Sequence, residues 1–296
     1  MDRRVPYICW HMTYRCNLRC RFCYAPKEGH EPGREELLAV GDALAAGCER
    51  ISMMGGEPLL NPHVPDVAAR LHGRCGLSLV TNGTLLTPEL VAALAPRLDR
   101  MSVSLDAVSQ DVATACRGPG YDMCRVTEGV RLVVRAGLPL KVNTLVTVRN
   151  AGHLAEILGF LASLGALVDW KLAEPAETAF TDGREVAPLR VPRGEFLRAA
   201  RSVADAAPAA VSVRTALCDD IGDYVLATPG GDIFTPSLNG SRPLGSALRE
   251  RPLDMLVRWG WNPSGNAETF RGKPLRRCMP EEEDRLEDDY EATPAS

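Results

Sequence analysis

The sequence predicts an α/β protein built on a parallel sheet, with a small C-terminal α+β extension. Short apolar or β-branched runs recur between residues 5 and 175, and segments with apolar residues at helical spacing lie between them. Six such strand–helix units can be counted. Their strands are almost continuously apolar in the centre, which is typical of a parallel sheet with helices on one face and a packed interior on the other.

The six predicted strands are bounded by turn residues. In chain order they are YICWHMTY (7–14), RISMMGG (50–56), LSLVTNG (77–83), RMSVSLD (100–106), LKVNTLVTV (140–148) and VDWKLAE (168–174). The clearest helical patterns are GREELLAVGDALAAGC (33–48), TPELVAALAPRL (87–98), CRVTEGVRLVVRAG (124–137) and NAGHLAEILGFLASLG (150–165). Gly137 and Gly165 stand where helix C-caps belong.

After residue 175 the alternation stops. We therefore predict a core at residues 1–175, an extension at 176–280 and an acidic, disordered tail at 281–296, which lacks an apolar face. Within the extension we expect a helix from about Glu195 to Ala207 and a hairpin around Pro229, Gly230 and Gly231.

Charge and hydropathy exclude several classes of protein. A net charge of −4 and a pI of about 5.8 give no electrostatic footprint for nucleic acid. No apolar run approaches the ~20 residues that span a bilayer, and the N-terminus carries no signal-peptide pattern. We expect a cytoplasmic protein that binds neither nucleic acid nor membrane.

Three of the ten cysteines are clustered in TYRCNLRCRFCYAP, at Cys16, Cys20 and Cys23. A closed zinc site needs four ligands, and His11, the nearest candidate for a fourth, lies on a predicted strand. An iron–sulfur cluster is also held by cysteine thiolates, normally four. Three cysteines would leave one iron with an open coordination position, which is useful to a catalyst.

The spacing C-x3-C-x2-C, with Phe22 before the last cysteine, resembles the motif of the radical S-adenosylmethionine (radical SAM) enzymes. Further motifs follow in family order. They are MGGEP after the second strand, TNGTLL after the third, SVSLDA on the fourth, RGPG at 117–120 and KVNTLV at 141–146. Any one of these is weak, but their order on the predicted elements identifies residues 5–175 as a member of this superfamily.

The resemblance implies a partial (β/α)6 parallel barrel and two cofactors. Cys16, Cys20 and Cys23 would hold one 4Fe–4S cluster, and the amino and carboxylate groups of S-adenosylmethionine would chelate the fourth iron. A reduced cluster would split the sulfonium, and the 5′-deoxyadenosyl radical would take hydrogen from a substrate carbon. The electron would come from a donor such as flavodoxin or ferredoxin.

The resemblance also assigns S-adenosylmethionine contacts. Gly55 and Gly56 would let the backbone approach the methionine end, and the Glu57 carboxylate would bind its ammonium. The remaining cofactor contacts are predicted at Phe22, Tyr24, Asn82, Ser104, Arg117 and Asn143. Of these, Arg117 would bind the carboxylate, and Tyr24 would meet the adenine mainly through its backbone.

Substrate contacts are predicted from strand parity. In LKVNTLV, Lys141 and Asn143 share one face, while the opposite face is small and β-branched, as suits packing on helices. In VDWKLAE, Asp169 and Lys171 share a face. Two of only four lysines therefore point into the predicted lumen. Either they bind an anionic group such as phosphate, or Lys171 forms a structural ion pair with Asp169 or Glu174.

Within the superfamily, these segments resemble the viperin-like enzymes, which act on nucleoside triphosphates, and the SPASM and twitch peptide maturases and molybdopterin-type cyclases. Asp169 stands where viperin-like enzymes usually have arginine, so viperin activity itself is not predicted. The segment after Cys218 resembles a degenerate SPASM or twitch extension. Only Cys218 and Cys278 remain there, too few for an auxiliary cluster.

We therefore predict a radical SAM enzyme, of oxidoreductase or lyase type, acting on a small molecule in specialised metabolism. The substrate would be a nucleotide, nucleoside or sugar, possibly phosphorylated. A maturase of a ribosomally made peptide is the alternative, although the first strand begins too near Met1 for the usual leader-binding domain. An inactive scaffold or binding protein is a third, which the intact cysteine motif disfavours.

Overall fold

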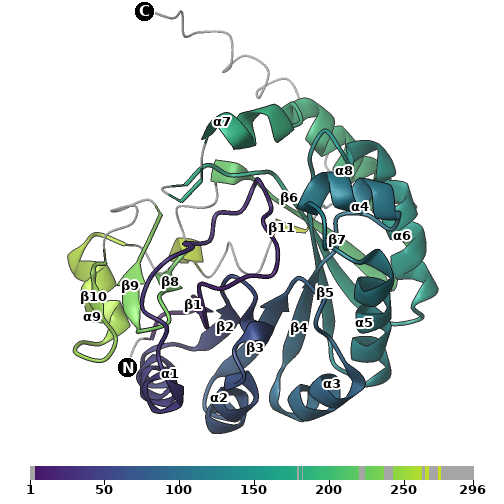
Figure 1. Cartoon of the computed structure of the whole chain (residues 1–296). Coiled ribbons are helices and arrows are strands. Elements are labelled where there is room, and N and C mark those ends of the chain that lie inside the picture. The colour runs from purple at the N-terminus through teal and green to yellow at the C-terminus, as the bar shows by residue number, and fades with distance from the viewer. Residues whose placement is uncertain are drawn as a thin grey trace, which may run out of the picture.

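A single curved sheet of eleven strands forms the centre of the described structure, in the order β10-β9-β8-β1-β2-β3-β4-β5-β6-β7-β11 (Figure 1). The computed structural model describes residues 4–178, 180–181, 183–219, 224–236, 243–261, 264–266 and 273–274. Predictions for Cys278 and for the tail at 281–296 lie outside these residues.

Strands β1 to β7 run parallel to one another. Their bounds are β1 Ile8–His11, β2 Arg50–Met54, β3 Gly76–Thr81, β4 Arg100–Ser104, β5 Leu140–Leu145, β6 Val168–Ala173 and β7 Val211–Ala216. Short strands extend both edges: β8 Leu226–Ala227, β9 Asp232–Phe234, β10 Gly245–Ser246 and β11 Lys273–Pro274.

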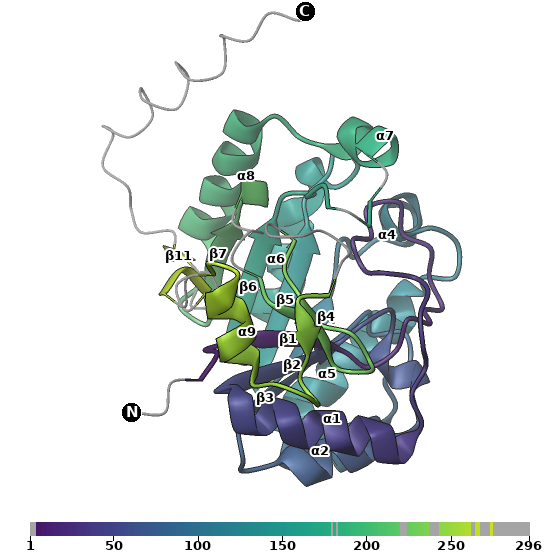
Figure 2. The same ribbon diagram turned by 90° about the vertical axis from the view of Figure 1, so that its left-hand side faces the viewer.

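Helices cover the convex side of the sheet, as Figures 1 and 2 show. The α-helices are α1 Arg34–Gly47, α2 Val64–Leu71, α3 Pro88–Leu94, α4 Gln110–Arg117, α5 Met123–Arg135, α6 Leu154–Ser163, α7 Gly183–Val186, α8 Arg193–Ala206 and α9 Pro252–Arg258. Single 3-10 turns are η1 Pro58–Leu60, η2 Ala95–Arg97, η3 Ala151–His153 and η4 Ala187–Leu189. The predicted fold class, a partial parallel barrel with a small α+β extension, is confirmed.

Burial alternates along the strands as parity predicts. On β5 and β6, Val142, Thr144, Trp170 and Leu172 are fully buried, and the Trp170 indole donates a hydrogen bond to Thr144 Oγ1 at 2.8 Å. The residues between them, which include Lys141 and Lys171, are only half-buried and face the concave side. One face of each strand thus belongs to the core under the helices, and the other is left for function.

Several local predictions are confirmed. Gly137 and Gly165 have φ values of 69° and 64°, the left-handed conformation of a C-cap. Helix α8 matches the helix expected from about Glu195 to Ala207, and β8 and β9 form the expected antiparallel hairpin. Among the described residues, no helix is both long and apolar enough to cross a membrane.

Strand β7 and helices α2 and α4 were not predicted from the sequence. Strand β7 follows α8 and pairs in parallel with β6 along its whole length. It was missed because Ser212, Arg214 and Thr215 make its sequence polar, and because the pattern we counted was an apolar strand with a helix behind it. Strands β7 and β8 both follow residue 175, so the sheet continues across the boundary between the two predicted parts of the chain.

Candidate active site

The three clustered cysteines lie on a loop that leaves the end of β1 and crosses the open side of the barrel (Figure 1). All three side chains are half-buried, and Cys16 and Cys20 pack against the core. The Leu18 N–H donates to Cys16 Sγ at 3.4 Å, and the Cys23 N–H donates to the Cys20 carbonyl at 3.1 Å. The loop therefore holds its thiols inward without a regular element.

The three cysteine thiols have the chemistry that an iron–sulfur cluster requires of its ligands. Burial raises the pKa of Cys20 to about 11, with smaller contributions in the same direction from Cys23 and Cys16. Desolvated thiolates need a cation to neutralise them, and soft sulfur donors select iron–sulfur clusters or zinc. Within the described part of the chain, no three His, Cys, Asp or Glu side chains converge on a single metal-ion position.

Gly56 and Glu57 bind the backbone of the segment that leads into the cysteine loop, and Gly55 lies close against it. The Gly56 N–H donates to the Thr13 carbonyl at 3.0 Å, and the Glu57 N–H donates to the Arg15 carbonyl at 2.8 Å. A Cβ on Gly56 would lie 2.2 Å from the Arg15 carbonyl oxygen, and one on Gly55 would lie 2.6 Å from that of Thr13. Both glycines are therefore required for this close approach, which holds the base of the loop against β2.

Glu57 is fully buried beneath the loop, and its carboxylate accepts three hydrogen bonds. The donors are Thr81 Oγ1 at 2.7 Å, the Asn82 N–H at 2.7 Å and the Leu59 N–H at 3.1 Å. Burial nevertheless raises the pKa of Glu57 to about 7. A cation beside this carboxylate would stabilise its ionised form and so offset the cost of burying the negative charge.

Asn82 connects β3 to the cysteine loop. Its amide donates to Asn17 Oδ1 at 2.9 Å, and its own oxygen accepts from the Thr84 N–H and hydroxyl at 2.9 and 2.6 Å. Since Asn17 lies directly after Cys16, this chain of bonds fixes the loop over the third strand.

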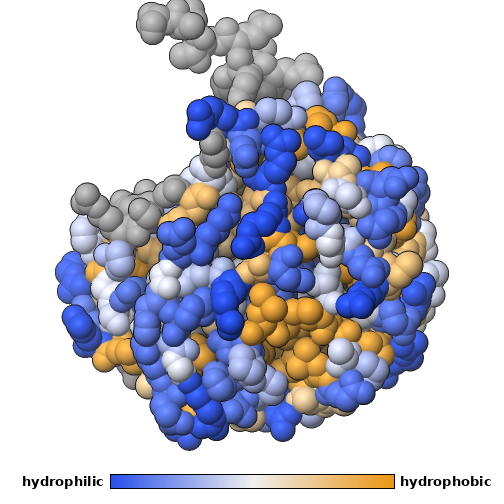
Figure 3. Space-filling view, in the orientation of Figure 1, coloured by the Kyte–Doolittle hydropathy of each residue, from blue (hydrophilic) through white to orange (hydrophobic). Residues whose placement is uncertain are grey.

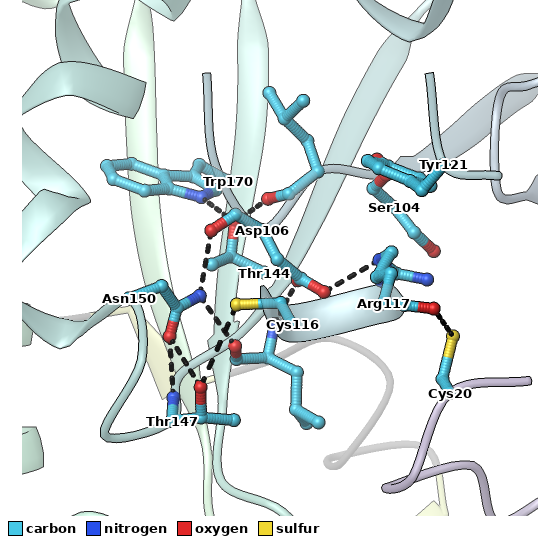
Figure 4. Close-up of polar contacts among 12 residues, drawn as sticks. Cys20, Ser104, Asp106, Cys116, Arg117, Tyr121, Thr144, Thr147, Asn150 and Trp170 are labelled. Carbon is cyan, nitrogen blue, oxygen red and sulfur yellow. Dashed lines mark hydrogen bonds and ion pairs between the residues drawn. The ribbon is translucent and has the colours of Figure 1, made fainter. Parts of the chain in front are cut away.

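Arg117 and Asp106 form a buried ion pair beside Cys20, shown in Figure 4. Arg117 Nε lies 2.7 Å from Asp106 Oδ2, and its guanidinium lies over the rings of Phe22 and Tyr121, at 5.5 and 5.3 Å from their centroids. The Cys20 thiol donates to the Arg117 carbonyl at 3.7 Å. Arg117 thus joins the cysteine loop to the barrel rim.

A second set of bonds, also in Figure 4, anchors Asp106. Asp106 Oδ1 accepts from the Leu145 N–H at 2.8 Å, and its carbonyl accepts from the Asn150 amide at 2.8 Å. The Asn150 oxygen in turn accepts from the Thr147 N–H at 2.7 Å. The ends of β4 and β5 are therefore tied to the residue that pairs with Arg117.

Three further residues were predicted to contact the cofactor: Ser104 on β4, Asn143 on β5 and Tyr24 on the cysteine loop. Ser104 ends β4, and its carbonyl accepts a hydrogen bond from the Tyr121 hydroxyl at 2.7 Å. Asn143 faces the concave side, and its Oδ1 is buried with no hydrogen-bond partner among the described residues. Tyr24 is half-buried on the cysteine loop, and burial, followed by Tyr224 and Cys9, raises its pKa well above the usual value.

Asp169 is paired with two arginines rather than with Lys171. Arg214 Nε donates to Asp169 Oδ1 at 2.7 Å, and a second contact joins Arg214 Nη2 to Oδ2. Arg100 Nη1 lies 3.2 Å from the same Oδ2. Glu174, the other carboxylate considered for Lys171, pairs with Arg193 at 3.1 Å. The structural ion pair expected as an alternative for Lys171 is therefore wrong.

The two lysines are left without a carboxylate partner in the part of the chain that the structure describes. Lys171 Nζ donates to the Tyr224 hydroxyl at 3.4 Å. Burial, and then the charge of Lys171, lowers the pKa of Lys141 to about 7. For Lys171 the effect of burial is outweighed by Tyr224 and Cys9, and its pKa is raised. This face of β5 and β6 carries more positive charge than Asp169 can neutralise.

The opposite wall of the concave face was not predicted from the sequence. Cys9, Leu226 and Phe234 form a buried apolar cluster there, apart from the main core, and Phe180 packs edge-on to Phe234 at 5.6 Å between ring centroids. His11 lies edge-on to Phe234 at 6.3 Å; it is fully buried, and neither ring nitrogen has a hydrogen-bond partner among the described residues.

The signal for this wall was present in the sequence. Trp10 lies against α1, so Cys9 and His11, on either side of it, must face the lumen, and the parity used for β5 would have shown this for β1. Burial lowers the pKa of His11 to about 4, so the imidazole is neutral.

Together, a thiol-bearing loop and a concave parallel barrel define a radical SAM protein, and the comparisons with known proteins agree. The family model described as "Radical SAM superfamily" matches residues 10–161, and the chain belongs to this superfamily. Its members are enzymes that use a 4Fe–4S cluster and S-adenosylmethionine, which confirms the predicted family and cofactors.

Two curated relatives resemble part of this chain. One, from Methanopyrus kandleri, is named "Probable GTP 3′,8-cyclase" and is 34% identical over 182 residues, covering 59% of this chain and 58% of the relative. The other is the AdoMet-dependent heme synthase of Methanosarcina barkeri, 32% identical over 168 residues, covering 54% and 48%. The chain thus spans about half the length of the curated relatives it matches.

Solved structures show the same fold at low identity. SuiB of Streptococcus suis bound to S-adenosylmethionine has a TM-score of 0.71 at 15% identity, covering 86% of this chain and 65% of SuiB. The structure of anSMEcpe with AdoMet and the Cp18Cys peptide has a TM-score of 0.67 at 14% identity, covering 85% and 80%.

Proposed function

We propose that this protein cleaves S-adenosylmethionine reductively and abstracts hydrogen from an anionic small molecule held on the concave face of the barrel. The observation that carries the proposal is the pair Lys141 and Lys171, two desolvated cations with no carboxylate partner among the described residues. Unpaired buried charge is costly, and it is usually retained where a ligand supplies the counter-charge.

The cofactor residues follow from the geometry of the loop and the barrel rim. When bound, the cluster and S-adenosylmethionine supply a one-electron cleavage that yields a 5′-deoxyadenosyl radical. Cys16, Cys20 and Cys23 would hold the cluster, and Glu57 would accept the methionine ammonium, for which its carboxylate has remaining lone pairs. Arg117, whose Nε pairs with Asp106, would direct its terminal nitrogens to the methionine carboxylate.

The other predicted contacts are proposed with more specific roles. Asn143 Oδ1 is an unsatisfied acceptor within the described structure and is suited to a ribose hydroxyl. Ser104 lies beside Asn143 in the register of β4 and β5 and would bind the same sugar. Phe22 packs on Arg117 and would fix its direction. We assign Asn82 to holding the loop through Asn17, and Tyr24 to the wall of the substrate site.

Two features of the concave face favour a phosphorylated or otherwise anionic substrate with an apolar or planar body. Lys141, Lys171, Arg100 and Arg214 line one wall, with Asp169 as the carboxylate that lies among them. Phe180, Phe234 and Cys9 line the other. A nucleotide would match both walls, and the relative from Methanopyrus kandleri is named for chemistry on GTP.

Asp169 does not oppose this proposal. A lone carboxylate would repel a phosphate, but here two arginines hold its charge. We propose that it orients Arg100 and Arg214 in the cationic wall.

The proposal also covers the source of the electron and the absence of a second cluster in the C-terminal extension. We propose a cytoplasmic enzyme with flavodoxin or ferredoxin as reductant. We also propose that the extension carries no auxiliary cluster. Cys218 supports this, because its thiol accepts from Arg193 Nη2 at 3.2 Å and its N–H donates to Glu174 at 3.0 Å, which gives it a structural place.

The test is substrate-stimulated release of 5′-deoxyadenosine from anaerobically reconstituted protein. Nucleotides, the matching nucleosides, sugar phosphates and a peptide panel are compared at equal concentration. The proposal predicts stimulation by an anionic small molecule and its loss in Lys171→Met. Stimulation by peptides alone would instead establish the alternative, a peptide maturase.

A further inference from the structure

The cysteine loop carries a concentration of positive charge on a protein that is acidic overall. Residues 15–27 contain Arg15, Arg19, Arg21 and Lys27 and no acidic residue, whereas the whole chain has a net charge of −4. We call these four residues the basic loop.

Exposure alternates along this loop. Arg15, Asn17, Arg19 and Arg21 are exposed, while Leu18 and Phe22 are buried and Cys16 and Cys20 are half-buried. The three arginines are therefore exposed and directly adjoin Cys16 or Cys20 in the sequence, and Lys27, also exposed, lies four residues after Cys23. On this side of the molecule Figure 3 shows hydrophilic residues where Figure 1 draws the loop.

Part of this charge is available to a partner. Arg19 binds the Cys16 and Leu18 carbonyls at 2.7 and 2.9 Å and so shapes the loop itself. Arg21 and Lys27 form no hydrogen bond or ion pair with any described residue.

Two acidic residues follow the loop: Glu28, directly after Lys27, is exposed and offsets part of the charge, and Glu31 is already engaged. Glu31 accepts hydrogen bonds from Thr13 Oγ1 and from the Tyr14 N–H, the latter at 2.7 Å. It is therefore held against the start of the loop.

We propose that the basic loop is the docking surface for an acidic, one-electron carrier protein of the flavodoxin or ferredoxin class. This rests on the proposed function, which needs one electron delivered to a cluster at these cysteines. Complementary charge steers encounter and fixes orientation. Docking here would bring the carrier's redox centre to the thiols through a single layer of side chains. The carrier loses one electron and the cluster gains it, so no further reactant is needed.

The experiment compares two reductants on the full-length, reconstituted protein: pre-reduced bacterial flavodoxin and dithionite. The test variant is Arg21→Glu/Lys27→Glu, chosen because neither side chain supports the loop. The surface control is Arg198→Glu, which reverses one charge where the test variant reverses two; Arg198 lies on α8 and forms no ion pair with another described residue. Iron content and direct binding of flavodoxin are measured for each protein at low and high salt.

We expect the test variant to lose at least tenfold in flavodoxin-supported release of 5′-deoxyadenosine at low salt, with iron content and the dithionite-supported rate unchanged. Binding of flavodoxin to the natural sequence should weaken as salt rises. Equal flavodoxin-supported rates in the variant and the natural sequence would overturn the proposal, as would an equal loss in Arg198→Glu or no flavodoxin binding at all. Failure of dithionite to support cleavage in any protein would instead count against the proposed function.

Discussion

Lys171 is the residue on which substrate binding depends most directly in this account. Its ammonium touches the Tyr224 hydroxyl and is otherwise free of carboxylates in the described structure. Lys171→Met keeps the length and apolar stem of the side chain but removes the charge. We expect substrate-stimulated cleavage to fall by about tenfold or more, since a charged hydrogen bond contributes roughly 1.5–3 kcal/mol.

Slow cleavage without substrate should be spared in this variant, because Lys171 lies on the substrate wall. Both rates are measured by 5′-deoxyadenosine release, and Arg198→Glu serves as a surface control. If both rates fall together, the residue supports the structure and the substrate assignment fails.

Lys141 makes stability depend on pH with a defined sign. Burial and Lys171 lower its pKa to about 7 in the folded protein, against 10.5 for an ordinary lysine. Between these values the unfolded chain binds more protons than the folded one, so the free energy of unfolding rises with pH. Denaturant unfolding at pH 7 and pH 9 should show this rise relative to Lys141→Met. An identical pH dependence in both proteins would show that Lys141 is charged throughout.

At the level of elements, the cysteine loop depends on its contact with the end of β2. A Cβ on Gly56 would meet the Arg15 carbonyl oxygen at 2.2 Å, so the backbone must move. We expect Gly56→Ala to destabilise the protein by about 1–3 kcal/mol, the usual cost of overpacking, and to lower its iron content. Gly152→Ala is the control, since nothing beyond its own stretch of chain lies within 4 Å of the position that its Cβ would take. Normal iron content in Gly56→Ala would contradict this role.

The same elements show what sequence patterns can and cannot predict. Parity along LKVNTLV and VDWKLAE placed Lys141 and Lys171 on the concave face, because side chains in a strand alternate strictly. Strand alternation could not predict which side chains pair with Asp169. Arg100 and Arg214 lie 69 and 45 residues away along the chain, and only the register of β4 to β7 brings them together.

Two other features of the structure, strand β7 and the aromatic wall, were not predicted from the sequence. Strand β7 was not predicted, although its Arg214 neutralises Asp169, because its own sequence is too polar to resemble the buried strands before it. His11 was considered only as a metal ligand, so its place on the aromatic wall was overlooked. The cofactor motifs could be proposed from the sequence because they are local in it. Only part of the cationic wall could be predicted: parity placed Lys141 and Lys171, but Arg100 and Arg214 join them through the register of four strands.

For the whole molecule, residues 1–175 depend on the C-terminal part of the chain. Truncation after residue 175 would remove β7 from the edge of β6 and Arg214 from Asp169, and β8 from the edge of β1. It would also remove Arg193, the partner of Glu174. We expect the truncated chain to aggregate or to melt at a much lower temperature than the full chain, because exposed strand edges and unpaired buried charge are both unfavourable. A monomeric fragment with the melting temperature of the full chain would show that the predicted core folds alone.

The central claim is that three thiolates hold a cluster at which S-adenosylmethionine is cleaved. Its most direct test is anaerobic reconstitution of the natural sequence and of Cys20→Ala, with iron analysis and measurement of 5′-deoxyadenosine after reduction by dithionite. The account predicts about four irons per chain and cleavage in the natural sequence, as expected for one cluster, and loss of both in the variant. A colourless, iron-free natural protein, or a Cys20→Ala protein that cleaves the cofactor at the natural rate, would contradict it.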